Sequence, residues 1–210
     1  MIAILTTKTL HHMHFVNEIF KKNRDIICIV EKKIISPNFK SKVFFERQRD
    51  SFEKKIWFTK SKPSFDSKVN YFYDINSKKV LNFLLRKKVK FILVFGTGKI
   101  NLKIYKKYIN RIFNFHGGNP EKYRGLDSHY WALYHKDFSA IETCLHQVKE
   151  KLDTGKIVYR KKIKINSNTK IYELRKKNTD LCIKFAIKFI NNIKKGRKII
   201  LTRQKSLGRY

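Results

Sequence analysis

Residues 1–30, MIAILTTKTLHHMHFVNEIFKKNRDIICIV, predict a β-strand, an α-helix and a second β-strand in that order. Residues 2–5 form a short apolar run and residues 26–30 a compact β-branched run, as expected of buried strands. Between them, Phe15 and Ile19 share one side of a helix. A strand–helix–strand opening implies a parallel pair with a right-handed crossover, and therefore an α/β fold.

The alternation of strands and helices continues along the chain. FILVF at residues 91–95 is the most convincing central strand, and RIFNFHGG at 111–118 reads as a strand ending in two glycines. Further strands are expected within residues 68–77, 140–148 and 156–165, and helices over 44–58, 80–89, about 127–135 and about 169–195. Because there is no repeat or Pro/Gly/Ser-rich linker, we expect one domain over 1–210, with its motifs at 91–163 and a basic tail at 196–210.

Composition indicates a folded, cytoplasmic protein. Hydrophobic residues make up 42% of the 210 residues, which is enough for one sizeable core. No apolar run approaches the roughly 20 residues that span a bilayer, and the first residues do not resemble a secretory signal. Cys28, Cys144 and Cys182 are odd in number and far apart, which favours buried thiols over disulfides or a zinc site.

The formal net charge of +33 is the most unusual compositional feature. It fits an anionic partner such as nucleic acid or a phosphorylated substrate. It also fits a general bias of the sequence toward lysine, with lysines filling solvated positions. The lysines lie along the whole chain and no nucleic-acid-binding motif accompanies them, so we favour the compositional explanation.

Three polar residues stand where strands should end. Asn114 and His116 lie in N-F-H-G-G, and Asp153 lies in L-D-T-G. Residues i and i+2 of a strand point to the same side, so Asn114 and His116 should project together. An amide beside an imidazole suits a carbonyl oxygen that gains negative charge, and a nearby carboxylate would favour the protonated, oriented imidazole. These groups suit acyl transfer without a covalent nucleophile.

Each element also has a structural explanation when it is taken alone. A histidine at a strand end commonly serves as a hydrogen-bonding residue, and D-T-G is a turn with aspartate as initiator and glycine at a positive φ. Taken together, however, N-F-H-G-G-N-P-E-K-Y-R-G at 114–125 and H-Q-V-K-E-K-L-D-T-G-K-I at 146–157 resemble the folate-dependent formyltransferase family. G-T-G-K-I at 96–100 stands where that family keeps a folate-contacting loop.

The resemblance implies a Rossmann-like α/β fold with a mostly parallel, twisted sheet flanked by helices. It implies 10-formyltetrahydrofolate as co-substrate and no metal. Asn114 and His116 would bind the formyl oxygen, and Asp153 would hold His116 in its working state and assist proton transfer. Tyr123, Arg124 and Gly125 would shape the entrance, where Arg124 could meet an anionic acceptor. The pterin pocket would be lined by Gly96, Thr97, Gly98, Lys99, Ile100, Gln147, Val148 and Asp153.

Three acceptors are known in this family. Members that act on glycinamide ribonucleotide have a glycine-rich phosphate loop after the first strand, whereas LTTKTLHH at 5–12 contains no glycine. Members that act on methionyl-tRNA carry a second domain, and this chain ends soon after its last expected helix. The run HGGNPEKYRGLDSHYWA at 116–132 is closer to sugar N-formyltransferases. We therefore favour a nucleotide-linked amino sugar, bound beside Thr7, His11 and His12.

Several alternatives stay open. His11 and His14 could share a helix face and bind a metal, although no third ligand is evident. Trp131 and Tyr134 are expected in the core, and the helix at 44–58 could contact a nucleotide or form the interface of a homodimer. The rival from another class is a non-catalytic anion- or nucleic-acid-binding protein on the same fold, which only the basic charge supports.

Overall fold

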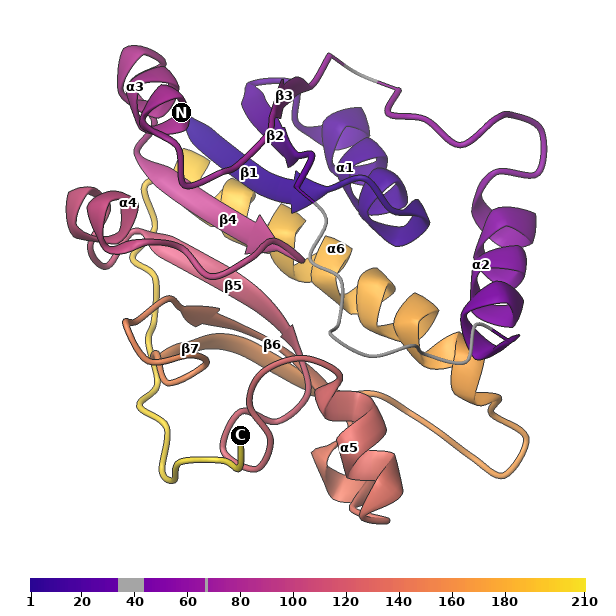
Figure 1. The fold of residues 1–210 in the computed structure, drawn as a ribbon. Helices are drawn as coiled ribbons and strands as arrows, with labels where there is room; N and C mark the ends of the chain where they lie inside the picture. The colour runs from indigo at the N-terminus through magenta and orange to yellow at the C-terminus, as the bar shows by residue number, and fades with distance from the viewer. Residues whose placement is uncertain (34–43, 67) are drawn as a thin grey trace.

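The computed structural model describes residues 1–33, 44–66 and 68–210. Its centre is a seven-stranded sheet with the order β3-β2-β1-β4-β5-β6-β7 (Figure 1). The first five of these strands run parallel, and β6 and β7 are antiparallel to their neighbours. The strands are β1 (Ile2–Thr7), β2 (Ile26–Glu31), β3 (Asn70–Phe72), β4 (Phe91–Phe95), β5 (Ile112–Gly117), β6 (Glu142–Gln147) and β7 (Ile157–Lys162). The expected mostly parallel α/β sheet is confirmed.

In the described ranges, six α-helices surround the sheet. They are α1 (Leu10–Lys22), α2 (Phe44–Trp57), α3 (Lys78–Arg86), α4 (Leu102–Lys107), α5 (Ser128–Tyr134) and α6 (Leu174–Lys194). Short 3₁₀ turns at Phe138–Ala140 and Ile171–Glu173 precede β6 and α6. None of the helices in the described ranges is long and apolar enough to cross a membrane.

Successive residues of the central strands enter two separate hydrophobic cores. Ile2 and Ile4 of β1 pack with α1 and α6 on one face, whereas Ala3 and Leu5 pack with α3 and α4 on the other. Both faces of the parallel strands are therefore covered. This explains why strands such as FILVF read as continuous apolar runs and not as alternating ones.

Helix α5 corrects one expectation about the core. Trp131 is 54% exposed and Tyr134 is 77% exposed, so neither is a core residue. The inward side of this short helix is occupied by the smaller or polar Ser128, His129 and Ala132, which are buried. The helix lies beyond the end of the sheet and has one narrow buried side, so its large aromatic residues remain at the surface.

The segment after α6 returns across the sheet. It passes β7 and ends beside the loop that follows β5 (Figure 1). An isolated bridge joins Thr202 to Ile157, and another joins Arg209 to Tyr123. The side chains of Ile199 and Leu201 pack against the core on the α6 side. The sequence describes this segment only as a basic tail, whereas the structure makes it part of the fold.

Candidate active site

Strand β5 places two polar side chains at one edge of the sheet. Asn114 and His116 project to the same side, as their spacing predicts, while Phe115 packs into the core against Phe15 at 5.2 Å between ring centroids. His116 is only 5% exposed. Because β1, β4 and β5 are parallel, the loops that follow them gather at this same edge.

Asp153, in the loop between β6 and β7, reaches both of these side chains. Its Oδ1 lies 3.4 Å from Asn114 Nδ2, and its Oδ2 lies 3.5 Å from His116 Nδ1. The main-chain N–H of Gly125 donates to Oδ2 at 2.7 Å. Asp153 thus forms one cluster with His116 and Asn114, which precede it in the chain by 37 and 39 positions.

A fourth member of the cluster, His146, had no role in the sequence prediction. It pairs with Asn114 across β5 and β6, and its Nε2 lies 3.2 Å from Asp153 Oδ1. Its Nδ1 faces the carbonyl oxygen of Gln147 at 2.8 Å. The motif around Asp153 already contained this histidine, but only the antiparallel β5–β6 register shows that it sits beside Asn114.

The electrostatic balance at Asp153 favours the ionised carboxylate. Burial alone would raise the pKa of Asp153, but the hydrogen bond from His146, the two imidazoles and the Gly125 N–H together hold that pKa well below its ordinary value. Burial lowers the pKa of His116, and it outweighs the Asp153 carboxylate, which raises it. The carboxylate therefore acts on the pKa of His116 in the expected direction, but burial has the larger effect.

Both ring nitrogens of His116 already face oxygen atoms. Nδ1 faces Asp153, and Nε2 lies 3.1 Å from the carbonyl oxygen of Tyr123. A carbonyl oxygen can only accept a hydrogen bond, so Nε2 carries the proton in this contact. For His116 to donate to a substrate oxygen, the contact with Tyr123 must be exchanged for a contact with the substrate.

The loop from Tyr123 to Gly125 contacts the cluster through its main chain. The ring of Tyr123 is buried and stacks on His135, so it does not shape an entrance. The guanidinium of Arg124 donates to the carbonyl oxygens of Gly208 at 2.7 Å and Leu152 at 3.4 Å. Both side chains hold the loop in place in this structure, and a contact of Arg124 with an anionic acceptor stays a prediction.

The loop Gly96–Ile100, after β4, lies beside the loop after β6. Ile100 and Val148 belong to the same hydrophobic cluster. The main-chain N–H groups of Lys99 and Ile100 donate to none of the described residues, whereas that of Gly98 donates to Glu31. Two facing loops with apolar side chains and uncommitted main-chain donors suit a planar heterocycle with polar edges, so this part of the chain fits a folate.

The side chain of Gln147 is buried and donates to the carbonyl oxygen of Asn110, so it supports the loop after β6. That its main chain lines the pterin pocket stays a prediction. In the D-T-G turn, Asp153 adopts the positive φ, +54°, that the sequence had suggested for the glycine. Gly155 is required for a different reason: a Cβ there would lie 1.8 Å from the carbonyl oxygen of Gln147.

The residues expected on the acceptor side gather around His12. Its Nδ1 lies 2.7 Å from the hydroxyl of Thr7 and 2.8 Å from that of Thr9. Burial lowers the pKa of His12 to about 3, so its ring is neutral. Gly96 has φ +77°, and a Cβ there would lie 2.1 Å from His12 Nε2, so β4 can only end in a glycine at this point. His11 lies next to His12, with 3.9 Å between ring centroids.

The histidines of α1 do not form a metal site in the described part of the chain. His14 stacks on Trp57 of α2, with 4.4 Å between centroids and 11° between planes. Within the described ranges there is no group of three or more His, Cys, Asp or Glu side chains that could hold a metal ion.

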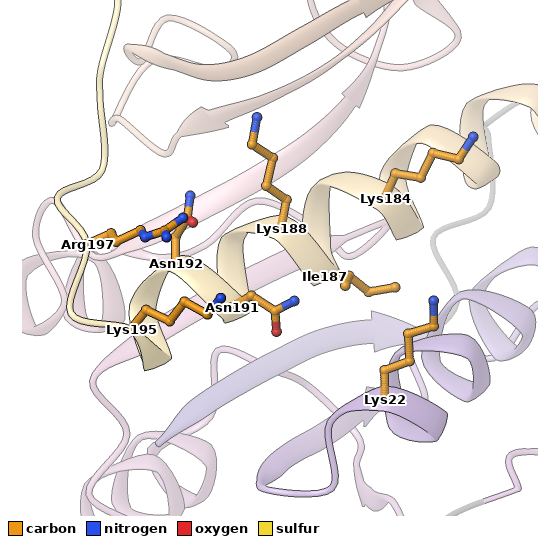
Figure 2. A pocket seen from close by; sticks show the side chains of 8 residues that line it. All are labelled: Lys22, Lys184, Ile187, Lys188, Asn191, Asn192, Lys195 and Arg197. Carbon is orange, nitrogen blue, oxygen red and sulfur yellow. The ribbon is translucent and has the colours of Figure 1, made fainter.

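A basic groove lies at the other end of the molecule. It is formed by the C-terminal half of α6, the segment after it and the end of α1 (Figure 2). The described residues that line it include four lysines and one arginine but no carboxylate; they are Lys22, Lys184, Ile187, Lys188, Asn191, Asn192, Lys195 and Arg197. The N-terminal half of α6 instead carries Asn178, whose Nδ2 would lie 3.3 Å from a Cβ at Gly117, the last residue of β5. The groove is therefore separate from the cluster around Asp153.

Similar folds occur among solved formyltransferases. A 4-N formyltransferase from Francisella tularensis is 18% identical over all of this chain and 75% of that one, with a TM-score of 0.64. The formyltransferase PseJ from Anoxybacillus kamchatkensis, solved with UDP-4,6-dideoxy-4-formamido-L-AltNAc and tetrahydrofolate, is 20% identical over 99% and 84%, with a TM-score of 0.58. Glycinamide ribonucleotide transformylase 1 from Symbiobacterium toebii is 15% identical over 99% and 93%, with a TM-score of 0.65.

These likenesses concern the fold, because the identities are low. A comparison with curated protein sequences gives no match. The model of the formyl transferase family, in contrast, matches residues 46–189, which include all four residues of the cluster around Asp153. The chain therefore belongs to the formyl transferase family and is an enzyme that uses a formyl-tetrahydrofolate for one-carbon transfer.

Proposed function

We propose that this enzyme transfers the formyl group of 10-formyltetrahydrofolate to the primary amine of a nucleotide-linked amino sugar. The transfer chemistry is supported by the position of Asn114, His116 and Asp153 at the carboxyl end of β5. The Asp153 carboxylate lies 3.4 Å from Asn114 Nδ2 and 3.5 Å from His116 Nδ1. An amide donor, an imidazole and an ionised carboxylate are the groups that acyl transfer to an amine requires.

Each residue of the cluster has its own role in the transfer. The bound folate supplies an activated formyl group. The Asn114 amide and the His116 Nε2–H donate to the formyl oxygen as it gains negative charge during attack by the amine. The amine nitrogen bonds to the formyl carbon, the bond from that carbon to the folate nitrogen breaks, and the proton lost by the amine passes to the folate nitrogen. Asp153 accepts and returns this proton, directly or through water.

Asp153 also stabilises the protonated state of His116 when that state is needed. In the ligand-free molecule the imidazole is neutral because burial prevails. A developing negative charge on the formyl oxygen would add a second anionic neighbour and favour protonation. The exchange of the Tyr123 carbonyl for the formyl oxygen at Nε2 belongs to the same step.

The folate would lie between the two apolar loops. We assign Gly96, Thr97, Gly98, Lys99 and Ile100 to one wall and Val148 with Asp153 to the other, while Gln147 supports the second wall from behind. The acceptor would approach from the side of Thr7, His11 and His12, at the end of β1 and the start of α1. Crevices at the carboxyl ends of parallel strands are the usual ligand sites of such sheets.

The choice of an amino sugar rests on the segment between β1 and α1. It contains no glycine, and its Thr7 and Thr9 hydroxyls are turned to His12. A main-chain phosphate cradle of the glycine-rich kind cannot form there. PseJ, which shares the fold, was solved with a UDP-linked formamido sugar, and this supports the same class of acceptor for this chain.

An absorbance assay for deformylated folate tests both parts of the proposal. The purified protein is mixed with 10-formyltetrahydrofolate and, separately, amino-sugar nucleotides, glycinamide ribonucleotide and methionyl-tRNA. We expect turnover with a sugar nucleotide alone. Turnover with either other acceptor would overturn the substrate class but not the chemistry. No turnover with any of the three acceptors, together with no binding of tetrahydrofolate, would favour a non-catalytic anion-binding protein.

A further inference from the structure

The segment after α6 contacts the Asp153 turn through the side chain of Gln204. The amide nitrogen of Gln204 donates to the carbonyl oxygen of Asp153 and to that of Gly155, at 2.8 Å in both cases. Only the NH₂ group of a glutamine can donate to two carbonyls, so the orientation of the amide follows from its partners. Its oxygen is buried and has no partner among the described residues, so the contact with the turn is made by the N–H groups alone.

Both carbonyls that Gln204 holds lie on the C-terminal side of the Asp153 Cα atom, so this contact restrains the ψ torsion of Asp153 and the backbone of the turn that follows it. Asp153 adopts φ +54°, in the left-handed region that aspartate occupies more often than most other L-residues. On the far side of the turn, Gly155 is pressed against Gln147. The carboxylate of Asp153 must meet the Gly125 N–H at 2.7 Å and His116 at 3.5 Å simultaneously. A small rotation of the turn would lengthen these contacts.

The same segment also holds the loop on the other side of His116. Arg209 N–H donates to the Lys122 carbonyl at 2.8 Å, and Arg124 N–H donates to the Arg209 carbonyl at 2.7 Å. Gly208 lies so close that a Cβ would be 2.5 Å from the Pro120 carbonyl oxygen. Residues 204–209 therefore join the Asp153 turn to the loop whose Tyr123 carbonyl and Gly125 N–H touch His116 and Asp153.

We propose that Gln204 is a positioning residue for formyl transfer. Its amide fixes the Asp153 turn against the Tyr123–Gly125 loop, so that the carboxylate stays within reach of His116. This inference rests on the roles proposed above for His116 and Asp153. It predicts that Gln204 affects the catalytic step and the ionisation of His116 more than the binding of either substrate.

Two substitutions separate hydrogen bonding from packing. Gln204→Glu keeps the size of the side chain but presents a carboxylate to two carbonyls, and Gln204→Ala removes the group. We expect kcat to fall about 10- to 100-fold in both, as is typical when the partner that orients a working group is lost, with each KM within about twofold. The matched control is Ser206→Ala, which removes a tail hydrogen bond to the Glu121 carbonyl but none to the turn.

A second readout does not depend on turnover. The pKa of His116 is followed by NMR titration of its ring in the ligand-free protein. If the carboxylate moves away in Gln204→Ala, the pKa of His116 should fall below its wild-type value, because the Asp153 charge raises it. Ser206→Ala should leave it unchanged.

The two proposals fail in different ways. A wild-type enzyme without formyl transfer would refute the proposed function, yet the shift at His116 would still support the positioning role of Gln204. An unchanged His116 pKa in both Gln204 variants would overturn the inference, as would a wild-type kcat or an equal loss of kcat in Ser206→Ala.

Discussion

At the scale of single residues, Asp153 connects every group proposed to act in the reaction. Its carboxylate lies beside two imidazoles, one amide and one main-chain N–H. The residue is only 8% exposed to solvent. The hydrogen bonds from His146 and from the Gly125 N–H help to hold the pKa of this carboxyl well below its ordinary value. Its negative charge is therefore present beside His116 at physiological pH.

His116→Ala and Asp153→Asn should abolish formyl transfer without unfolding the protein. The first removes a donor to the formyl oxygen, and the second removes the charge that favours protonated His116; each should lower kcat by at least about a hundredfold. Single-turnover formyl transfer measures the loss, and circular dichroism checks the fold. Near-native turnover in either variant would contradict the assigned roles.

At the scale of elements, α2 is joined to α6 by a buried ion pair. Glu53 of α2 is fully buried, and its two oxygens accept from Nε and Nη2 of Arg175 on α6, both at 2.6 Å. Asp50, one turn earlier, accepts from the same Nη2 but is half-exposed. This pair, together with His14 of α1 stacked on Trp57, holds α2 against α6 and α1.

Glu53→Ala should destabilise the protein by about 3 kcal/mol, because it leaves a largely buried guanidinium with only an exposed partner. Asp50→Ala is the matched control, and a loss of at most about 1 kcal/mol is expected for the exposed partner. Urea unfolding gives both values. Equal losses in the two variants would show that burial of Glu53 contributes nothing to the strength of the link.

At the scale of the whole molecule, buried neutral histidines make stability depend on pH. Burial lowers the pKa of His12 to about 3 and that of His129 to about 4. In the unfolded chain both rings protonate near pH 6.5, so the unfolded state takes up protons that the folded state cannot. The stability they contribute is complete above that pH and is lost as the pH falls toward the folded values.

Between pH 8 and pH 5 these two histidines should reduce the free energy of unfolding by about 4 kcal/mol in total. The contribution of Asp153, whose pKa is lowered, is lost only below the ordinary aspartate range and does not affect this interval. Urea titrations at several pH values measure the slope. A free energy of unfolding that stays constant down to pH 5 would mean that these rings are protonated in the fold.

The net charge of +33 predicts a second property of the whole molecule. A strongly basic surface attracts an anionic acceptor, and salt screens that attraction. With a nucleotide sugar as acceptor, kcat/KM should fall by about tenfold between roughly 50 mM and 300 mM salt, while kcat stays constant. Charge reversal of Lys188 and Lys195 in the remote groove of Figure 2 should change this slope little. A slope that depends on those two lysines would point to the groove as a functional surface.

Local patterns were sufficient for most of the fold. The apolar runs placed β1, β2, β4 and β5 close to their observed bounds, because a strand buried on both faces needs no information from distant residues to be recognised. The helical periodicity of residues 169–195 likewise predicted α6, whose Leu174, Leu181, Phe185 and Phe189 are all buried. The i, i+2 spacing alone predicted that Asn114 and His116 face the same side.

Contacts between segments far apart in the chain were decided only in the tertiary structure. No local pattern shows that His146 pairs with Asn114, that Gln204 supports the Asp153 turn, or that Arg124 is committed to the tail. The net direction of the His116 pKa shift could not be predicted from the sequence for the same reason, because burial depends on everything packed around the ring. The positions of strands and helices are determined largely by neighbours in the sequence. The orientation of a carboxylate and the protonation of an imidazole are determined by neighbours in space.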